Sequence, residues 1–112
     1  MKGYPAYQVC INACLHCAAL CNHCALSCTT EEDIKMMARC IQLDMECSAI
    51  CYATANLMSL DSEKAIAICA ICADVCEACA NECSLHDNEH CRQCADACTA
   101  CAAECKNIAA LN

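Results

Sequence analysis

Residues 10–28 read CINACLHCAALCNHCALSC, in which six cysteines follow one another at steps of four and three positions. This spacing places the six sulfurs on one face of an α-helix. The same steps recur in residues 69–83 and in residues 91–105. A seam with this period is typical of helices that pack together in a bundle, although leucine usually occupies it. The sequence therefore predicts a helical bundle whose core is lined with thiols.

Helix-breaking residues are confined to the beginning of the chain. Gly3 and Pro5 are the single glycine and the single proline, so nothing interrupts long helices after them. Breaks in the cysteine pattern and candidate capping residues divide the chain into helices at residues 4–28, 31–58, 62–85 and 88–110. The expected caps of the last three helices are Thr30, Asp61 or Ser62, and Asp87. The short connections favour an all-α, antiparallel up-down-up-down four-helix bundle with a cysteine-lined core, and its length makes residues 1–112 a single domain.

The second predicted helix departs from the thiol pattern. In steps of three and four, its inward face carries Met37, Cys40, Asp44, Cys47, Cys51, Thr54 and Met58. A carboxylate, a hydroxyl and two thioethers thus stand where the other helices have thiols. Asp44 has three possible roles: it binds metal, it receives a proton, or it is a buried carboxyl satisfied by Thr54 or by water.

Cysteine can also serve as a small hydrophobic residue in an ordinary core. The larger aliphatic residues argue against that role here, because they flank the seam instead of occupying it. A core selected for packing would place them on the seam, since each buries more apolar area than a thiol. The flanking residues are Ile11, Leu15, Leu20, Leu26, Ile41, Leu43, Ile50, Ile66, Ile68 and Ile71.

So many cysteines would ordinarily suggest a secreted disulfide scaffold. The count of 19 is odd, however, and the spacing is helical. Neighbours at i and i+4 point along one face, which disfavours the torsion that a disulfide requires. No export signal is visible before the cysteines begin, so we expect a cytoplasmic protein whose cysteines are reduced and bind metal.

Thiolates select Cu(I), zinc or iron–sulfur clusters. Zinc sites made of four cysteines would bury excess negative charge, because no Lys or Arg lies on a cysteine seam to offset it. One Cu(I) per thiolate leaves the interior neutral. The C-x-x-C-x-x-C run of many iron–sulfur proteins is absent, and the C-x-x-C pairs lack the βαβ context of thioredoxin-like redox motifs. The sequence therefore predicts multiple Cu(I) ions in each chain.

All the cysteines are candidate metal ligands, together with three other residues. The full set is Cys10, Cys14, Cys17, Cys21, Cys24, Cys28, Cys40, Cys47, Cys51, Cys69, Cys72, Cys76, Cys79, Cys83, Cys91, Cys94, Cys98, Cys101, Cys105, His86, His90 and Asp44. The two histidines flank the turn between the third and fourth helices, at the same end as the first connection. With Met36 and Met37 they form a candidate mouth through which copper enters, although both histidines can also be ordinary surface residues.

The net charge of −8 argues against nucleic acid or an anionic membrane as a partner. No stretch of about 18 purely apolar residues is present, so we expect no membrane span. A binding function based on thiolates, without an enzymatic reaction, is the simplest interpretation.

Three segments carry a resemblance to a known family: CIQLDMEC at 40–47, CANEC at 79–83 and HDNEHC at 86–91. With the four cysteine-lined helices, they make the chain closely resemble the bacterial four-helix-bundle copper storage proteins, in particular their cytosolic branch. The resemblance implies storage of many Cu(I) ions inside each bundle, loading from one end, and homotetramers. Members of the family commonly have another histidine where this chain has Asn88.

We therefore expect a cytosolic Cu(I) storage protein that is not an enzyme, with copper ions and a copper chaperone as partners. The alternative of the same class is a metallothionein-like buffer of zinc or another soft d10 metal. The alternative of another class is a dithiol redox protein or an iron–sulfur protein.

Overall fold

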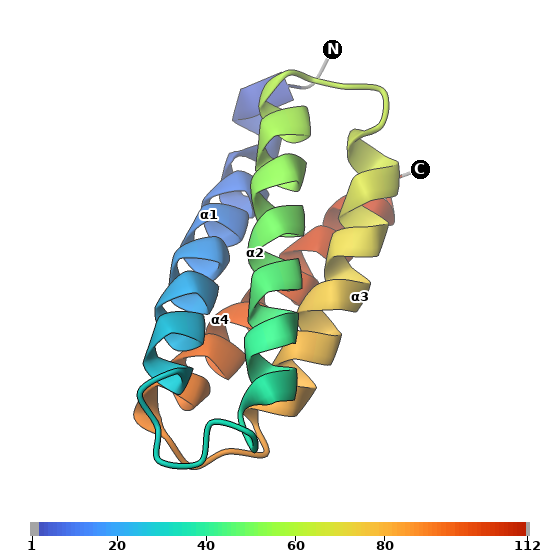
Figure 1. The fold of residues 1–112 in the computed structure, drawn as a ribbon. Helices are drawn as coiled ribbons and strands as arrows, with labels where there is room; N and C mark the ends of the chain where they lie inside the picture. The colour runs from blue at the N-terminus through green and yellow to red at the C-terminus, as the bar shows by residue number, and fades with distance from the viewer. Residues whose placement is uncertain (1–2, 112) are drawn as a thin grey trace.

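The computed structural model describes residues 3–111, which form an elongated bundle of four antiparallel helices (Figure 1). The helices are α1 (Gly3–Cys28), α2 (Ala38–Ser59), α3 (Ala65–Cys83) and α4 (Glu89–Ala109). Each helix packs against two neighbours around the bundle, in the order α1, α2, α3, α4 and back to α1. The predicted up-down-up-down fold class is confirmed.

The second helix begins at Ala38 and not at residue 31, so the predicted start is wrong. The hydroxyls of Thr29 and Thr30 donate back to the carbonyl oxygens of Leu26 and Ser27, at 2.6 and 2.8 Å. They therefore close the end of α1, and Thr30 does not cap α2. Residues 29–37 form a connection at one end of the bundle.

The predicted caps of α3 and α4 are also wrong. Helix α3 begins at Ala65, and the Ser62 hydroxyl accepts a hydrogen bond from the Lys64 backbone nitrogen (3.0 Å) within the preceding turn. Helix α4 has Asn88 as its N-cap residue in place of Asp87. The N-cap residues of α3 and α4 are Lys64 and Asn88, and neither makes a side-chain capping bond.

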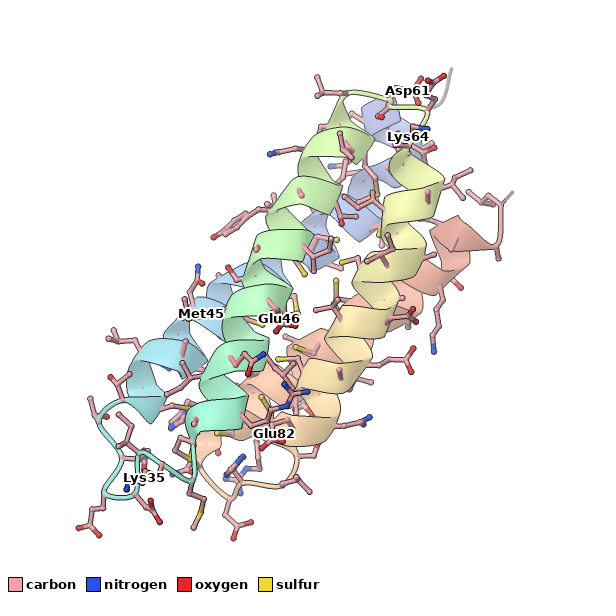
Figure 2. All side chains as sticks on the ribbon, turned by 45° about the vertical axis from the view of Figure 1, so that its right-hand side comes forward. Lys35, Met45, Glu46, Asp61, Lys64 and Glu82 are labelled. Atoms are coloured by element: carbon pink, nitrogen blue, oxygen red, sulfur yellow. The ribbon has the colours of Figure 1, made fainter. Side chains whose placement is uncertain are left out.

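The core of the bundle is built from sulfur. Every cysteine is at most 3% exposed, and the sulfur atoms lie between the helices in Figure 2. The larger aliphatic residues flank this core as expected: Leu15, Leu26 and Ile71 are exposed, whereas Ile11 and Leu43 are buried beside the thiols. Thiols thus occupy most of the inward positions that large aliphatic residues usually fill in a helical bundle.

The two ends of the bundle differ in what closes them. The 29–37 and 84–88 connections lie together at one end, and the 60–64 turn lies at the other, with the beginning of α1 and the end of α4 (Figure 1). Figure 2 shows Lys35 and Glu82 at the first end and Asp61 and Lys64 at the second.

Residues Tyr4–Cys28 of α1 are long and apolar enough to cross a membrane by length and composition, with a mean hydropathy of 1.5. The core helix of a bundle passes the same test. In this structure the cysteines of α1 are buried in the core.

We expect the reduced, metal-free protein to be a folded helical bundle at neutral pH. Protonated thiols are neutral and mildly apolar, so they can be buried without a metal. Small zinc domains, by contrast, need their metal to fold. Circular dichroism of the reduced apo protein should show a helical spectrum that changes little when Cu(I) is added. A random-coil spectrum without metal would contradict this expectation.

Candidate metal centre

All nineteen cysteines are free thiols, and all except Cys10 have no exposed surface. Six of the eight cysteine pairs at i and i+4 have sulfur–sulfur distances of 3.8–4.0 Å. Two thiolates bound to one ion are at most about 4.6 Å apart if each bond is about 2.3 Å, the zinc–thiolate length. The sulfurs are therefore close enough to share ions without movement of the helices.

The shortest sulfur–sulfur contacts cross between helices, which the sequence pattern alone did not reveal. The sulfurs of Cys40 and Cys83 are 3.5 Å apart, and Cys47 lies 3.6 Å from Cys76. Contacts of 3.6 Å also join Cys17 to Cys98 and Cys94 to Cys21. The helices thus supply facing thiols as well as pairs along each helix.

The sulfurs gather into groups of four whose atoms all lie within 4.8 Å of one another. Several of these groups have members in common, and contacts of Cys83 with Cys40 (3.5 Å) and Cys79 (4.0 Å) join the group that contains Cys40 to them, so the core is a continuous array and not a set of separate sites. The groups include Cys14/Cys51/Cys72/Cys101, Cys17/Cys51/Cys76/Cys101, Cys17/Cys21/Cys47/Cys98, Cys21/Cys79/Cys94/Cys98 and Cys24/Cys28/Cys40/Cys91. Shared thiolates suit ions that are bridged to one another, whereas a structural zinc site is most often a closed set of four ligands around one ion.

Among the residues that the structure describes, no Lys or Arg is buried in the core. Burial raises the pKa of Cys91 to about 12 and also raises that of Cys28. These thiols therefore remain protonated at neutral pH unless a cation takes the place of the proton.

Asp44 is completely buried on the thiol face of α2. Its Oδ1 atom accepts hydrogen bonds from Cys79 and Cys94, each at 3.2 Å, and from Cys83 at 3.5 Å. The predicted alternative in which Thr54 satisfies this carboxyl is wrong, because the Thr54 hydroxyl donates to the Ile50 carbonyl oxygen (2.7 Å). Burial raises the pKa of Asp44 to about 10.

The two histidines of the predicted mouth have different surroundings. His90 Nδ1 lies 3.3 Å from the sulfur of Cys24 and 3.5 Å from that of Cys91. His86 Nε2 instead pairs at 3.0 Å with Glu82, which lies four residues earlier in the sequence, on α3. Of the two imidazoles, His90 is the one held against the thiols.

The two methionines of the predicted mouth also differ, because Met37 is buried at the start of α2 and Met36 is 63% exposed. At the other end, the Cys69 thiol lies 3.6 Å from the buried Met58 thioether. Ile108 packs against the core there, partly buried.

Sequence reasoning missed Glu31, which it assigned to the first turn of a helix. Its carboxylate contacts His90 Nε2 at 3.2 Å and Asn88 Nδ2 at 2.8 Å. The signal available in the sequence was an acidic run, Glu31 to Asp33, at the same end of the bundle as the histidines.

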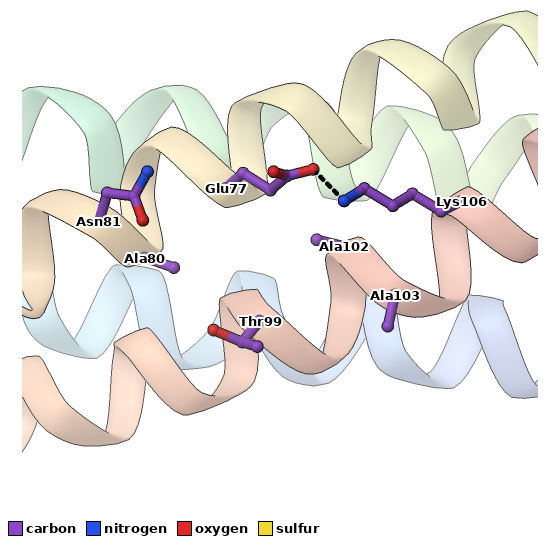
Figure 3. Close-up of a pocket in the computed structure, with 7 residues that line it drawn as sticks. All are labelled: Glu77, Ala80, Asn81, Thr99, Ala102, Ala103 and Lys106. Atoms are coloured by element: carbon purple, nitrogen blue, oxygen red, sulfur yellow. Dashed lines mark ion pairs between the residues drawn. The ribbon is translucent and has the colours of Figure 1, made fainter.

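A surface pocket of about 340 Å³ lies between α3 and α4, outside the thiol core (Figure 3). An ion pair between Glu77 and Lys106 (2.6 Å) spans it, and three alanines form part of its wall. It contains no cysteine, so it is separate from the metal-binding core.

A four-helix bundle with a continuous array of buried thiols belongs to the class of soft-metal-binding proteins. The model of the family described as copper storage protein (Csp) matches residues 4–110. The chain therefore belongs to the copper storage protein family.

Several relatives are similar over most of their length. The cysteine-rich protein YhjQ of Bacillus subtilis is 46% identical over 85 residues, which are 76% of this chain and 79% of that protein. The Cu(I)-bound copper storage protein BsCsp3 has a TM-score of 0.89 at 45% identity, covering 92% of this chain and 97% of that one. The copper storage protein Ccsp of Streptomyces lividans, loaded with 10 copper equivalents, has a TM-score of 0.87 at 39% identity, covering 90% and 81%.

The stability of the reduced apo protein should fall as pH rises from 5 to 8, and Asp44 should cause much of that fall. The unfolded chain loses the Asp44 proton near pH 4, whereas the folded chain keeps it to about pH 10. The folded state therefore binds more protons over this range, so one such group lowers the free energy of unfolding by up to about 1.4 kcal/mol per pH unit.

Denaturant unfolding of wild type and Asp44→Asn at several pH values measures this slope. The variant should have a flatter profile, and Asp96→Asn, which changes an exposed carboxylate on α4, should behave as wild type. Parallel profiles for wild type and Asp44→Asn would show that the Asp44 carboxyl is ionised in the core.

Proposed function

We propose that this protein stores many Cu(I) ions, bound by the thiolates that line its bundle. The observation that carries the proposal is the array of overlapping four-sulfur groups, all buried and all free of disulfides. Membership of the copper storage protein family supports it. BsCsp3, which binds Cu(I), and Ccsp, which is loaded with 10 copper equivalents, support the choice of metal and the binding of several ions.

Charge balance explains how so many ions can be held. Each Cu(I) that binds displaces a thiol proton, so one positive charge replaces another and the interior stays near neutral. The nineteen cysteines are the proposed ligands. His90 is proposed to act at the mouth, with His86 further from the thiols, and Asp44 to accept or donate a proton, or to bind an ion, beside Cys79 and Cys94.

The proposal is one of storage and not of catalysis. Within the described residues the thiols have almost no exposed surface, which suits sequestration of an ion better than reaction with an organic substrate. Reduced thiols in this number require a reducing compartment, and a Streptomyces relative is described as cytosolic. We therefore place the protein in the cytoplasm, where a copper chaperone would deliver its cargo.

We propose that the protein is a homotetramer, and the outer surface supports self-association. Helix α1 contains no Asp, Glu, Lys or Arg, although the chain carries a net charge of −8. Val9, Leu15 and Leu26 on α1 are exposed, as are Met45 and Tyr52 on the adjacent α2. A second copy of this chain can cover the α1 face without burying an unpaired Asp, Glu, Lys or Arg side chain of that helix.

A buffer of zinc or another d10 metal is the second candidate. Two groups, Cys14/Cys51/Cys72/Cys101 and Cys17/Cys51/Cys76/Cys101, each take one sulfur from every helix of the bundle, as a closed tetrahedral site can. Because neighbouring groups share sulfurs, zinc would fill only a few such sites and would leave the remaining thiols protonated.

Titration with Cu(I) in competition with a chelator should saturate near one ion per cysteine, which is about nineteen per chain. A weakly buffered sample should release about one proton per ion, because a core without a basic side chain disfavours buried thiolates until Cu(I) replaces their protons. Affinity should accordingly weaken as pH falls. Saturation at a handful of ions, or tighter binding of zinc than of Cu(I), would contradict storage of Cu(I).

Replacing His90 by alanine should slow both loading and chelator-driven removal, while total capacity stays almost unchanged. The reason is its contact with Cys24 and Cys91, which makes it the imidazole nearest the thiols. His86→Ala is the matched control and should change the rates less, because His86 pairs with Glu82. Stopped-flow measurement of Cu(I) transfer compares them. Wild-type rates in the His90 variant would show that copper enters the bundle at another place.

A further inference from the structure

The Glu31 carboxylate joins the two connections at the histidine-bearing end of the bundle. One oxygen contacts His90 Nε2 at 3.2 Å, and the other accepts a hydrogen bond from the Asn88 side-chain amide at 2.8 Å. Glu31 lies on the 29–37 connection, whereas Asn88 and His90 lie at the start of α4. A residue far away in the sequence thereby fixes the orientation of His90.

This contact determines which imidazole nitrogen faces the thiols with a free lone pair. An ionised carboxylate only accepts hydrogen bonds, so Nε2 carries the hydrogen and donates it to Glu31. In the neutral imidazole Nδ1 then has a lone pair, and this atom lies 3.3 and 3.5 Å from the sulfurs of Cys24 and Cys91. Metal-binding histidines commonly donate their second nitrogen to a carboxylate in this way, which fixes both the tautomer and the ring orientation.

We propose that Glu31 is a positioning residue for copper entry, an inference that rests on the proposed storage function. It holds His90 in the tautomer whose Nδ1 can take Cu(I) and pass it to the outermost thiols. Those thiols are the group Cys24, Cys28, Cys40 and Cys91, two of which His90 already contacts. The bond from Asn88 restrains the second carboxylate oxygen and so keeps Glu31 facing the imidazole.

The other nearby acids do not have this geometry. Asp33 accepts a hydrogen bond from the Met36 backbone nitrogen (3.2 Å) within its own connection. Glu82 is paired with His86. Glu32 is exposed on the same connection as Glu31 and carries the same charge, so it provides a matched control.

Three variants separate positioning from charge: Glu31→Ala, Glu31→Gln and Glu32→Ala. Nitrogen-15 NMR of the reduced apo protein reports the His90 tautomer without any metal. Wild type and Glu31→Gln should show hydrogen on Nε2, because a glutamine oxygen can still accept it. Glu31→Ala should show a mixture of tautomers, and Glu32→Ala should match wild type.

The rate of Cu(I) transfer from a weak chelator should follow the tautomer. Glu31→Ala should load about tenfold more slowly, in the range found for residues that orient metal-binding histidines. Glu31→Gln and Glu32→Ala should load close to the wild-type rate, and all three variants should keep the wild-type capacity. In a His90→Ala background, Glu31→Ala should have no further effect, because the residue acts through that imidazole.

An unchanged tautomer in Glu31→Ala would overturn the proposal, and so would an altered tautomer with normal loading. Slow loading by Glu32→Ala or by Glu31→Gln would show that the lost negative charge, and not the position of His90, slows copper entry. The same conclusion would follow if Glu31→Ala slowed loading further in the His90→Ala background. Failure of the storage function has a different signature: wild type itself would bind only a few Cu(I) ions, while the NMR result would stand unaffected.

Discussion

The constraint on which the whole molecule depends is the free-energy cost of burying negative charge in a core that offers no basic side chain. Nineteen thiols are enclosed among four helices, and the described core contains no Lys or Arg. Each thiol must therefore keep its proton or exchange it for another cation. A proton and a Cu(I) ion carry the same charge, so the bundle tolerates both, and this equivalence underlies the proposed storage.

The same constraint accounts for the fold. In the metal-free state, protonated cysteines act as small apolar residues, and they let the helices approach closely enough for sulfurs on facing helices to lie 3.5–4.0 Å apart. Large aliphatic residues on the seam would hold the helices further apart and fill the space between sulfurs. Their position at the flanks, as with Ile11 and Leu43, therefore contributes apolar burial without separating the thiols.

The number of helices and the face that each buries could be predicted from the sequence, because cysteine periodicity is a local property. The start of α2 could not, since an acidic run after two threonines reads as a helix start, whereas Thr29 and Thr30 bond back to α1. The buried position of Asp44 was predictable from its register, but its contacts with Cys79 and Cys94 depend on how α2, α3 and α4 pack. The bond between Glu31 and His90 joins residues 59 positions apart, and no periodicity indicates it.

Storage of many ions requires that the thiols form one shared array and not a set of separate sites. X-ray absorption at the copper edge of the fully loaded protein tests it most directly, because the spectrum reports both the ligand atoms and any metal neighbours of each ion. We expect a first shell dominated by sulfur, with a clear contribution from neighbouring copper ions bridged by thiolates. A fully loaded protein with isolated copper ions, each without a copper neighbour, would contradict it.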